Sequence, residues 1–251
     1  TESFELLFLG GSSAGGAYQF AEEPEAFFPA LIHNSICDQL PATTRLSTFN
    51  FAEGGRNSFT FSRAMDQILE QTHPDLVVAY VGVNERTADH LYTRKEMEER
   101  EQSQTPVTRE LGALAGWSRT VVGLSLLMRS NEVSETQGDR VAEVPLQDFQ
   151  ENLVSIQRAI GEAHLVLVSQ VVLGSLREDL VPYWEVEAEL AQGSESVDHV
   201  RLPELLPDLD PETAFFDQNH LTRDGHQSIH DVLFPKILKA VDSTALKRGS
   251  Q

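Results

Sequence analysis

The chain has 251 residues, 40% of them hydrophobic, which is enough for one large domain with a substantial buried core. Its formal net charge of -20 argues against a nucleic-acid partner and against docking on an anionic membrane, because no basic surface is available to neutralise phosphates. The single cysteine, Cys37, excludes an intrachain disulfide and a thiol metal cluster. Its place in a helical pattern predicts a buried structural thiol.

No apolar stretch approaches the length that spans a bilayer. The chain opens on Thr1 immediately before a predicted strand, which is typical of a trimmed or processed start. Localisation is therefore left open by the sequence, with secretion and anchoring among the alternatives.

The first predicted element is a short buried strand within Phe4–Gly16 (FELLFLGGSSAGG) that ends in glycines and serines. The next elements alternate between helix and strand: a helix from about Glu25 to Leu40, a strand at Leu46–Phe51, a helix capped by Asn57 or Ser58, and a strand at Leu76–Val81. The last of these is a continuous apolar run, which indicates a central parallel strand buried on both faces.

The alternation lapses between residues 86 and 144, an insertion whose alternatives are a cap over the sheet edge, a dimer contact or a decoration. A helix from Pro145 to Gly161 then restores the pattern. The remaining predicted elements are a strand at His164–Val172, a loop over 173–197 with a short helical piece around Trp184–Ala191, a weak strand at Asp198–Leu202, and a last helix kinked or interrupted at Pro235.

Strand and helix alternate through the whole chain without an internal repeat or an obvious linker. This pattern predicts one α/β domain over residues 1–251, with a parallel sheet covered by helices on both faces.

Four polar loops carry the residues that suggest chemistry. They are Gly10-Gly11-Ser12-Ser13, Gly54-Gly55-Arg56-Asn57, Gly82-Val83-Asn84-Glu85 and Asp217-Gln218-Asn219-His220. Three of them follow predicted strands, and in open α/β sheets ligands bind at the carboxyl ends of the strands. Together the loops offer a hydroxyl, an imidazole, a carboxylate, a backbone amide beside glycine and a carboxamide, which are the groups needed for acyl transfer through a serine.

A serine hydroxyl is unreactive at neutral pH without a base, and an imidazole held by a carboxylate is such a base. Asp217 and His220 are three residues apart on one turn, within reach of each other. The oxyanion needs prearranged donors, which the amides of Ser12 and Gly55 and the side chain of Asn84 would supply. Losing one such donor typically costs about 3 kcal/mol of activation free energy.

The four loops resemble, in the same order, the four blocks of the SGNH (GDSL-type) hydrolase superfamily. FLGGSS resembles the first block, AEGGRNS the second, YVGVNE the G-x-N-D block and FFDQNHLTRDGH the D-x-x-H block. The resemblance implies a three-layer α/β/α sandwich with a five-stranded parallel sheet, and lipase-like ester hydrolysis without a cofactor. It also implies Ser12 as nucleophile, Asp217 and His220 as its partners, and Ser12, Gly55 and Asn84 as the oxyanion hole.

Two positions depart from the family pattern. Gly11 stands where relatives usually carry Asp, which predicts a more mobile or open nucleophile turn. Glu85 replaces the usual Asp of the third block and leaves Asn84 in place. Ser13 is an adjacent alternative nucleophile, but it matches a variable position of the family, so Ser12 is preferred.

Other polar residues have simpler interpretations. His226 and His230 are four residues apart on a predicted helix, but no H-E-x-x-H pattern accompanies them, so no metal is expected and a partly exposed helix face is the alternative. Arg56 would contact an anionic substrate group or form a surface ion pair. The first loop lacks the Lys-Ser/Thr ending of a phosphate-binding P-loop.

The sequence therefore predicts a serine esterase that hydrolyses carboxylic esters through an acyl-enzyme on Ser12. Esters of short acyl chains or acetyl groups are the expected substrates. The expected partner is a small-molecule or carbohydrate ester. An O-acyltransferase with the same triad and a catalytically idle binding domain are the alternatives. Oligomeric state and the alcohol part of the substrate are left open.

Overall fold

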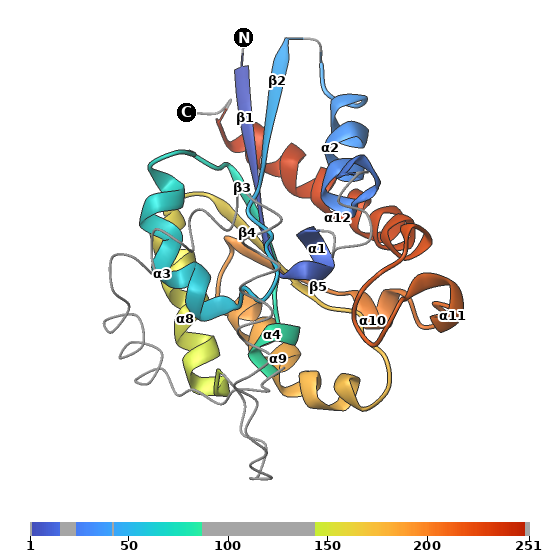
Figure 1. Cartoon of the computed structure of the whole chain (residues 1–251). Coiled ribbons are helices and arrows are strands. Elements are labelled where there is room, and N and C mark those ends of the chain that lie inside the picture. The colour runs from blue at the N-terminus through green and yellow to red at the C-terminus, as the bar shows by residue number, and fades with distance from the viewer. Residues whose placement is uncertain (1, 16–23, 42, 87–143, 249–251) are drawn as a thin grey trace, which may run out of the picture.

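The computed structural model describes residues 2–15, 24–41, 43–86 and 144–248. Its centre is a five-stranded parallel sheet with the strand order β2-β1-β3-β4-β5 (Figure 1). The strands are β1 (Glu2–Gly10), β2 (Thr44–Asn50), β3 (Leu76–Tyr80), β4 (His164–Ser169) and β5 (Val197–Arg201). The predicted α/β class with a five-stranded parallel sheet is confirmed.

Helices cover both faces of this sheet (Figure 1). One layer consists of α2 (Phe28–Cys37) and α12 (Arg223–Arg248), and the other of α3 (Ser58–Leu69), α8 (Leu146–Ile160) and α9 (Ser175–Gln192). Five short helical turns complete the described elements: α1 (Ser12–Gly15), η1 (Pro24–Ala26), α4 (Val83–Arg86), α10 (Leu202–Leu205) and α11 (Pro211–Ala214).

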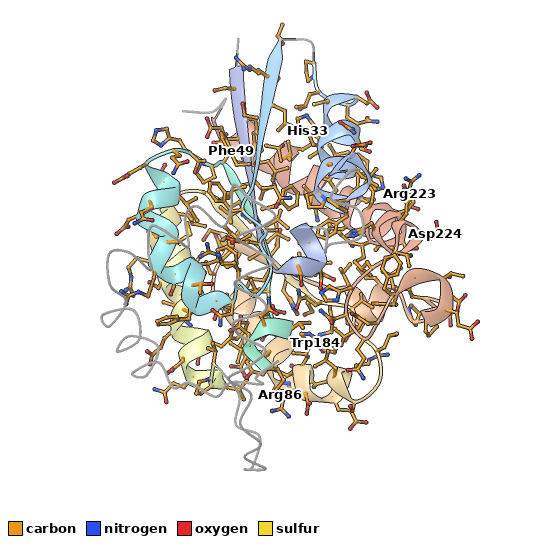
Figure 2. All side chains as sticks on the ribbon, in the orientation of Figure 1. His33, Phe49, Arg86, Trp184, Arg223 and Asp224 are labelled. Atoms are coloured by element: carbon orange, nitrogen blue, oxygen red, sulfur yellow. The ribbon has the colours of Figure 1, made fainter. Side chains whose placement is uncertain are left out.

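The side chains of β1 alternate between the two helical layers, as the period of a strand requires. Leu6 and Phe8 join the cluster under α2 and α12, whereas Leu7 and Leu9 join the cluster under α3, α8 and α9. All four are at most 1% exposed. Figure 2 shows how densely side chains fill the space on both sides of the sheet. The strand is apolar throughout this stretch because both of its faces are covered.

The position of β1 between β2 and β3 decides where a site can form. The chain leaves β1 toward β2 on one side, and then crosses to β3 on the other, so the strand order reverses at β1. In doubly wound sheets, ligands bind outside the carboxyl ends of the strands at such a reversal. The helical turn α1, which follows β1, contains Ser12, and the helical turn α4, which follows β3, contains Asn84.

Local sequence signals account for several helix ends. Asn57 accepts the Thr60 N–H, and Thr60 Oγ1 accepts the Asn57 N–H, so the predicted cap of α3 is a complete capping box. Pro29 lies in the first turn of α2, where its missing N–H has no cost. Gly161 ends α8 with φ of 62°, a left-handed conformation that favours glycine.

The expectations for the segment 173–197 and for Cys37 were wrong. The segment 173–197 is mostly helix α9 rather than a loop, and it continues through Pro182. Tertiary packing explains this, since Trp184 (labelled in Figure 2) and its neighbours on α9 are buried against the sheet. Helix α12 contains Pro235 in its interior, and the expected kink or interruption there stays a prediction. Cys37 is exposed rather than buried, because it lies at the last residue of α2.

The predicted insertion at 86–144 falls almost entirely on residues 87–143, which lie outside the described part of the chain. Within the described ranges, no helix is long and apolar enough to cross a membrane.

His226 is buried between the two helices of the first layer, not on a partly exposed face as expected. It is 2% exposed, its ring lies 5.3 Å from that of Phe27 and 5.9 Å from that of Phe28, and its Nδ1 accepts the Phe28 N–H at 3.5 Å. Burial disfavours the charged imidazolium and lowers the pKa of His226 to about 4. The ring is therefore a neutral core side chain that fastens α12 to α2.

This burial predicts acid sensitivity. An unfolded histidine takes up a proton near pH 6.5, whereas His226 in the folded chain does so only near pH 4. The stability contributed by the neutral ring is complete above pH 6.5 and is lost as the pH falls toward 4, by up to about 1.4 kcal/mol per pH unit. Urea unfolding between pH 7 and 4 should show a shallower decline for His226→Asn than for the unmodified chain. The exposed His73 provides the control, and equal slopes for His226→Asn and His73→Asn would contradict the prediction.

Candidate active site

The structure brings Ser12, His220 and Asp217 together at the carboxyl edge of the sheet. Ser12 Oγ lies 2.8 Å from His220 Nε2, although the two residues are 208 positions apart in the sequence. His220 Nδ1 lies 2.6 Å from Asp217 Oδ2. Because the carboxylate accepts the Nδ1–H, the facing Nε2 is the acceptor for the serine hydroxyl. The three side chains form one continuous chain of hydrogen bonds.

The turn that carries Asp217 and His220 is shaped by its own hydrogen bonds. Asp217 Oδ1 accepts the backbone N–H groups of Asn219 and His220 at 2.9 and 2.8 Å, and His220 O accepts the Phe216 N–H at 2.8 Å. Burial by itself raises the pKa of Asp217, but the hydrogen bonds from the His220 ring and the two amides outweigh it and lower that pKa. Asp217 therefore remains a carboxylate at neutral pH.

Asn84 lies next to the nucleophile turn, as its place after β3 predicts. It is the second residue of α4, and its Nδ2 donates to Arg56 O at 2.7 Å. The bond connects the loop after β3 to the loop after β2, which contains Gly55.

Gly55 lies at the third position of a tight turn. The Arg56 N–H donates to Glu53 O at 3.2 Å, and Gly55 has φ of 76°. A positive φ at this position is required by a type II turn, and glycine meets it without strain. The turn bond does not use the Gly55 N–H. The adjacent loop residue Glu53 donates its N–H to Gly10 O at 3.0 Å, which holds the turn against the end of β1.

Gly11 is packed against the carboxamide of Asn84, and the expected open nucleophile turn is not observed. Gly11 is buried, and a Cβ built on it would overlap Asn84 Nδ2 and lie 3.5 Å from Arg56 O. The space that a Cβ would take at this position is thus filled by Asn84. The absence of a side chain at Gly11 allows Asn84 to approach the backbone beside Ser12.

Glu85 connects the loop after β3 to α3. Its carboxylate is fully buried and accepts the Ser58 N–H at 2.7 Å and the Ser58 hydroxyl at 3.0 Å. A negative group at the amino end of a helix is electrostatically favourable. Asn152 of α8 donates to Ser58 Oγ at 3.1 Å and accepts the Ser62 hydroxyl at 3.2 Å. This buried network connects α4 to α3 and α8. Asn152 was not singled out from the sequence, and Ser58 was named there only as a possible helix cap.

Gln170 is a second support that the sequence analysis missed. It is 3% exposed, its Oε1 accepts the Val83 N–H at 2.5 Å, and its Nε2 donates to Tyr80 O at 3.1 Å. The side chain therefore spans the loop in which β3 turns into α4. The signal in the sequence was the pair Ser169-Gln170, two polar residues directly after the apolar run of β4.

The remaining candidates have partners of their own. Ser13 is 4% exposed and donates its hydroxyl to Asn219 O at 2.9 Å, not to His220. Arg56 forms an ion pair with Glu53 at 2.6 Å, as one of its two interpretations predicted. His230 is bonded to Ser35 Oγ at 2.8 Å and to Asp231 at 2.9 Å. Among the described residues, no three His, Cys, Asp or Glu side chains are grouped so that they could hold a metal ion.

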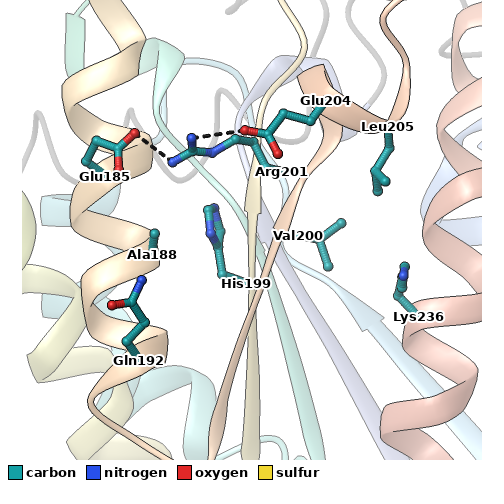
Figure 3. A pocket seen from close by; sticks show the side chains of 9 residues that line it. All are labelled: Glu185, Ala188, Gln192, His199, Val200, Arg201, Glu204, Leu205 and Lys236. Carbon is teal, nitrogen blue, oxygen red and sulfur yellow. Dashed lines mark hydrogen bonds and ion pairs between the residues drawn. The ribbon is translucent and has the colours of Figure 1, made fainter.

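A separate hollow of about 480 Å³ lies beside β5, between α9 and α12 (Figure 3). Arg201 crosses its upper end and bonds Glu185 at 2.9 Å and Glu204 at 3.1 Å. His199 points from β5 toward α9, and its Nε2 lies 3.4 Å from Oε2 of the fully buried Glu187, which also accepts the Ser169 hydroxyl at 2.7 Å. Burial raises the pKa of Glu187. Strands β3 and β4 separate this hollow from β1 and Ser12.

Comparison with solved structures identifies the fold. Three similar structures are TesA (16% identity, TM-score 0.56, covering 96% of this chain and 97% of that one), the lipase/acylhydrolase from Enterococcus faecalis (15%, 0.59, 94% and 96%) and the acetylxylan esterase Axe2 from Geobacillus stearothermophilus (15%, 0.58, 93% and 94%). The chain has the SGNH hydrolase fold. No protein-family profile matches the sequence, and no curated protein does.

The SGNH fold explains why the four loops lie together. In this arrangement β1 and β3 are adjacent, and the turn before α12 returns to the same edge of the sheet, so that four segments far apart in sequence meet around Ser12. The resemblance drawn from the motifs is thus confirmed for the architecture over nearly the whole chain.

The packing of Gly11 predicts a destabilising effect of a single methyl group. In Gly11→Ala the added Cβ overlaps Asn84 Nδ2, so either the Asn84 side chain shifts and weakens its bond to Arg56 O or the two loops move apart, at a cost of about 1–3 kcal/mol in the free energy of unfolding. Gly11 does not have a positive φ, so this cost comes from overlap rather than from the backbone. Gly193→Ala is the matched control, because its Cβ would have no neighbour nearer than 3.6 Å. Urea denaturation measures both, and equal stabilities would show that Gly11 is not tightly packed.

Proposed function

We propose that this protein is a serine esterase that hydrolyses carboxylic esters through an acyl-enzyme on Ser12. The observation that carries the proposal is the chain of hydrogen bonds from Ser12 Oγ to His220 Nε2 at 2.8 Å and from His220 Nδ1 to Asp217 Oδ2 at 2.6 Å, beside the left-handed Gly55 turn and the Asn84 carboxamide. A hydroxyl, an imidazole and a carboxylate in this order form the acyl-transfer arrangement that recurs on unrelated folds.

In the first step, the Ser12 hydroxyl attacks the carbonyl carbon of the ester. His220 Nε2 takes the hydroxyl proton, and Asp217 stabilises the resulting imidazolium through Nδ1. The carbonyl oxygen gains negative charge, to which the Ser12 and Gly55 amides and the Asn84 carboxamide donate. When the tetrahedral intermediate collapses, His220 gives the proton to the leaving alcohol, and the acyl group stays on Ser12.

In the second step, a water molecule attacks the acyl-enzyme and gives its proton to His220. Collapse of the second tetrahedral intermediate breaks the bond to Ser12 Oγ, which takes the proton back from His220. The products are the carboxylic acid and the free enzyme. The same groups act in both steps because the second step repeats the first with water in place of the serine.

The proposed substrates are esters of short acyl chains, with acetyl esters preferred. Similarity to Axe2, an acetylxylan esterase, and to a two-domain esterase active on acetylated mannans (15% identity, TM-score 0.57, covering 95% of this chain and 50% of that one) supports a carbohydrate ester as the natural form. Nitrophenyl acetate is a suitable first substrate, because its leaving group reports turnover and it makes few demands on the alcohol side. A panel of longer acyl chains then measures the preference.

The triad predicts a large loss of activity on two substitutions. Ser12→Ala and His220→Ala should each lower kcat for nitrophenyl acetate by about 10⁴-fold or more. The chain offers a matched control, since Ser35 Oγ lies 2.8 Å from His230 Nε2 and His230 Nδ1 lies 2.9 Å from Asp231 Oδ1. Ser35→Ala and His230→Ala should retain activity. Unchanged turnover in Ser12→Ala or His220→Ala would sink the proposed mechanism.

The role of Asn84 as an oxyanion donor predicts a smaller loss of activity that affects kcat more than KM. Asn84→Ala removes one donor to the developing charge, so kcat should fall about 10²–10³-fold while KM stays nearly constant. An effect confined to KM would instead assign Asn84 to substrate binding.

Two further experiments test the alternative functions. Labelling by a fluorophosphonate probe separates a working Ser12 from an idle one, and product analysis with an added sugar separates hydrolysis from acyl transfer to that sugar.

A further inference from the structure

Ser13, the residue after the proposed nucleophile, has no role in the chemistry described above, and yet it is bonded directly to the turn that carries His220. Its hydroxyl donates to Asn219 O at 2.9 Å and accepts from Asn219 Nδ2 at 3.3 Å. Ser13 is 4% exposed. A buried hydroxyl that both donates and accepts in this way is held in one orientation.

The two bonded residues are each the direct neighbour of a catalytic partner. Ser13 follows Ser12 on α1, and Asn219 precedes His220 on the turn. Residues 13 and 219 are 206 positions apart, so their contact joins two segments that are far apart in the sequence. It runs beside the Ser12–His220 hydrogen bond and constrains the same separation.

The shape of the turn does not by itself fix its place. The bonds of Asp217 Oδ1 to the Asn219 and His220 amides act within the turn, and so does the bond from the Phe216 N–H to His220 O. These bonds would persist if the whole turn shifted relative to Ser12. Connections to other elements are needed to hold it, and they include the Leu173 N–H to Gln218 O bond at 2.8 Å and the Ser13–Asn219 couple.

We propose that Ser13 is a positioning residue that sets the His220 imidazole at hydrogen-bond distance from the Ser12 hydroxyl, with Asn219 as its partner. The proposal rests on the function proposed above. Proton transfer between Ser12 and His220 depends on their separation, and a misplacement of about 1 Å in an active site can cost about 10²-fold in rate. Ser13 therefore acts through His220 and does not touch the substrate.

The two bonds of the couple make different predictions. Ser13→Ala removes both, because both end on the hydroxyl. Asn219→Ala removes only the 3.3 Å bond, since the backbone oxygen that accepts the 2.9 Å bond remains. Ser13→Ala should therefore lower kcat for nitrophenyl acetate by about 10–100-fold with KM changed less than about twofold, and Asn219→Ala should lower kcat by less.

A double-mutant cycle tests the coupling. The variant with both substitutions should have the kcat of Ser13→Ala, because the Asn219 side chain has lost its partner already. If the fold-decreases in kcat of the two single variants multiply in the double variant, the two residues act separately and the proposal is overturned. A kcat of Ser13→Ala equal to that of the unmodified enzyme would also overturn it. Ser35→Ala is the matched control, since it also removes a serine hydroxyl bonded across two elements, α2 and α12.

Thermal unfolding and NMR separate positioning from simple structural support. A purely structural Ser13 would lower the unfolding temperature of Ser13→Ala but leave the kcat of the folded protein and the His220 ring-proton resonances unchanged. The proposal expects those resonances to shift in Ser13→Ala and not in Ser35→Ala. If Ser13→Ala does not fold, Ser13→Cys, which replaces the hydroxyl by a thiol that is only a weak donor and acceptor, is compared in the same way, and an unshifted His220 ring with unchanged kcat overturns the proposal.

The same measurements distinguish this inference from the proposed function. If the unmodified protein neither turns over nitrophenyl acetate nor reacts with a fluorophosphonate probe, the proposed function fails. The His220 ring resonances then still decide whether Ser13 positions the imidazole. If the unmodified protein is active and Ser13→Ala matches it in kcat and in these resonances, the esterase proposal stands and the role of Ser13 is rejected.

Discussion

The parallel pairing of β1 with both β2 and β3 is the constraint on which the rest of the site depends. Leu6, Leu7, Phe8 and Leu9 are at most 1% exposed, and fully burying such side chains is worth about 1.5–3 kcal/mol each. This burial holds the strand at the centre of the sheet. At its end the chain must turn sharply, and a Cβ on Gly10 would lie only 2.7 Å from Ala14 Cβ. The sheet therefore delivers Ser12 to one place, and the loops after β2 and β3 to either side of it.

Behind the carboxyl edge, buried polar side chains hold the loops in position. Glu85 bonds the first residue of α3, and Gln170 spans the turn from β3 into α4. Burying such groups is costly unless they are hydrogen-bonded, and these have partners with good geometry. Each of them connects different elements, so a displacement of one loop would leave a buried polar group unpaired. The network thus adds directional contacts to a region where Val81 and Val83 already belong to the apolar core.

A serine, a histidine and an aspartate at hydrogen-bond distances do not make a catalytic site by themselves. Ser35, His230 and Asp231 repeat the arrangement at the contact of α2 and α12. Ser35 lies inside a helix, however, where backbone N–H groups bond to carbonyl groups one turn earlier and do not converge on a developing oxyanion. Around Ser12 the chain leaves a strand, Gly55 adopts a left-handed conformation, and Asn84 approaches a glycine. The surrounding donors, rather than the triad distances, distinguish the two places.

The sequence by itself indicated the class of the fold, because apolar runs that end in polar turns alternate with helical patterns along the chain. The residues of the candidate site were indicated by the resemblance of four polar loops to the blocks of a known superfamily, not by any one loop alone. The sequence also predicted the α3 cap and the ends of α8, which depend on local hydrogen bonds. Helix α9, the exposure of Cys37 and the burial of His226 could not be predicted, since they depend on which face of a helix the sheet or a neighbouring helix covers. Gly11 appeared in the sequence as a missing carboxylate, and only the structure gives the reason that glycine fits there. The decisive contacts, Gly11 with Asn84 and Ser13 with Asn219, join residues 73 and 206 positions apart, and such separations leave no local pattern in the chain.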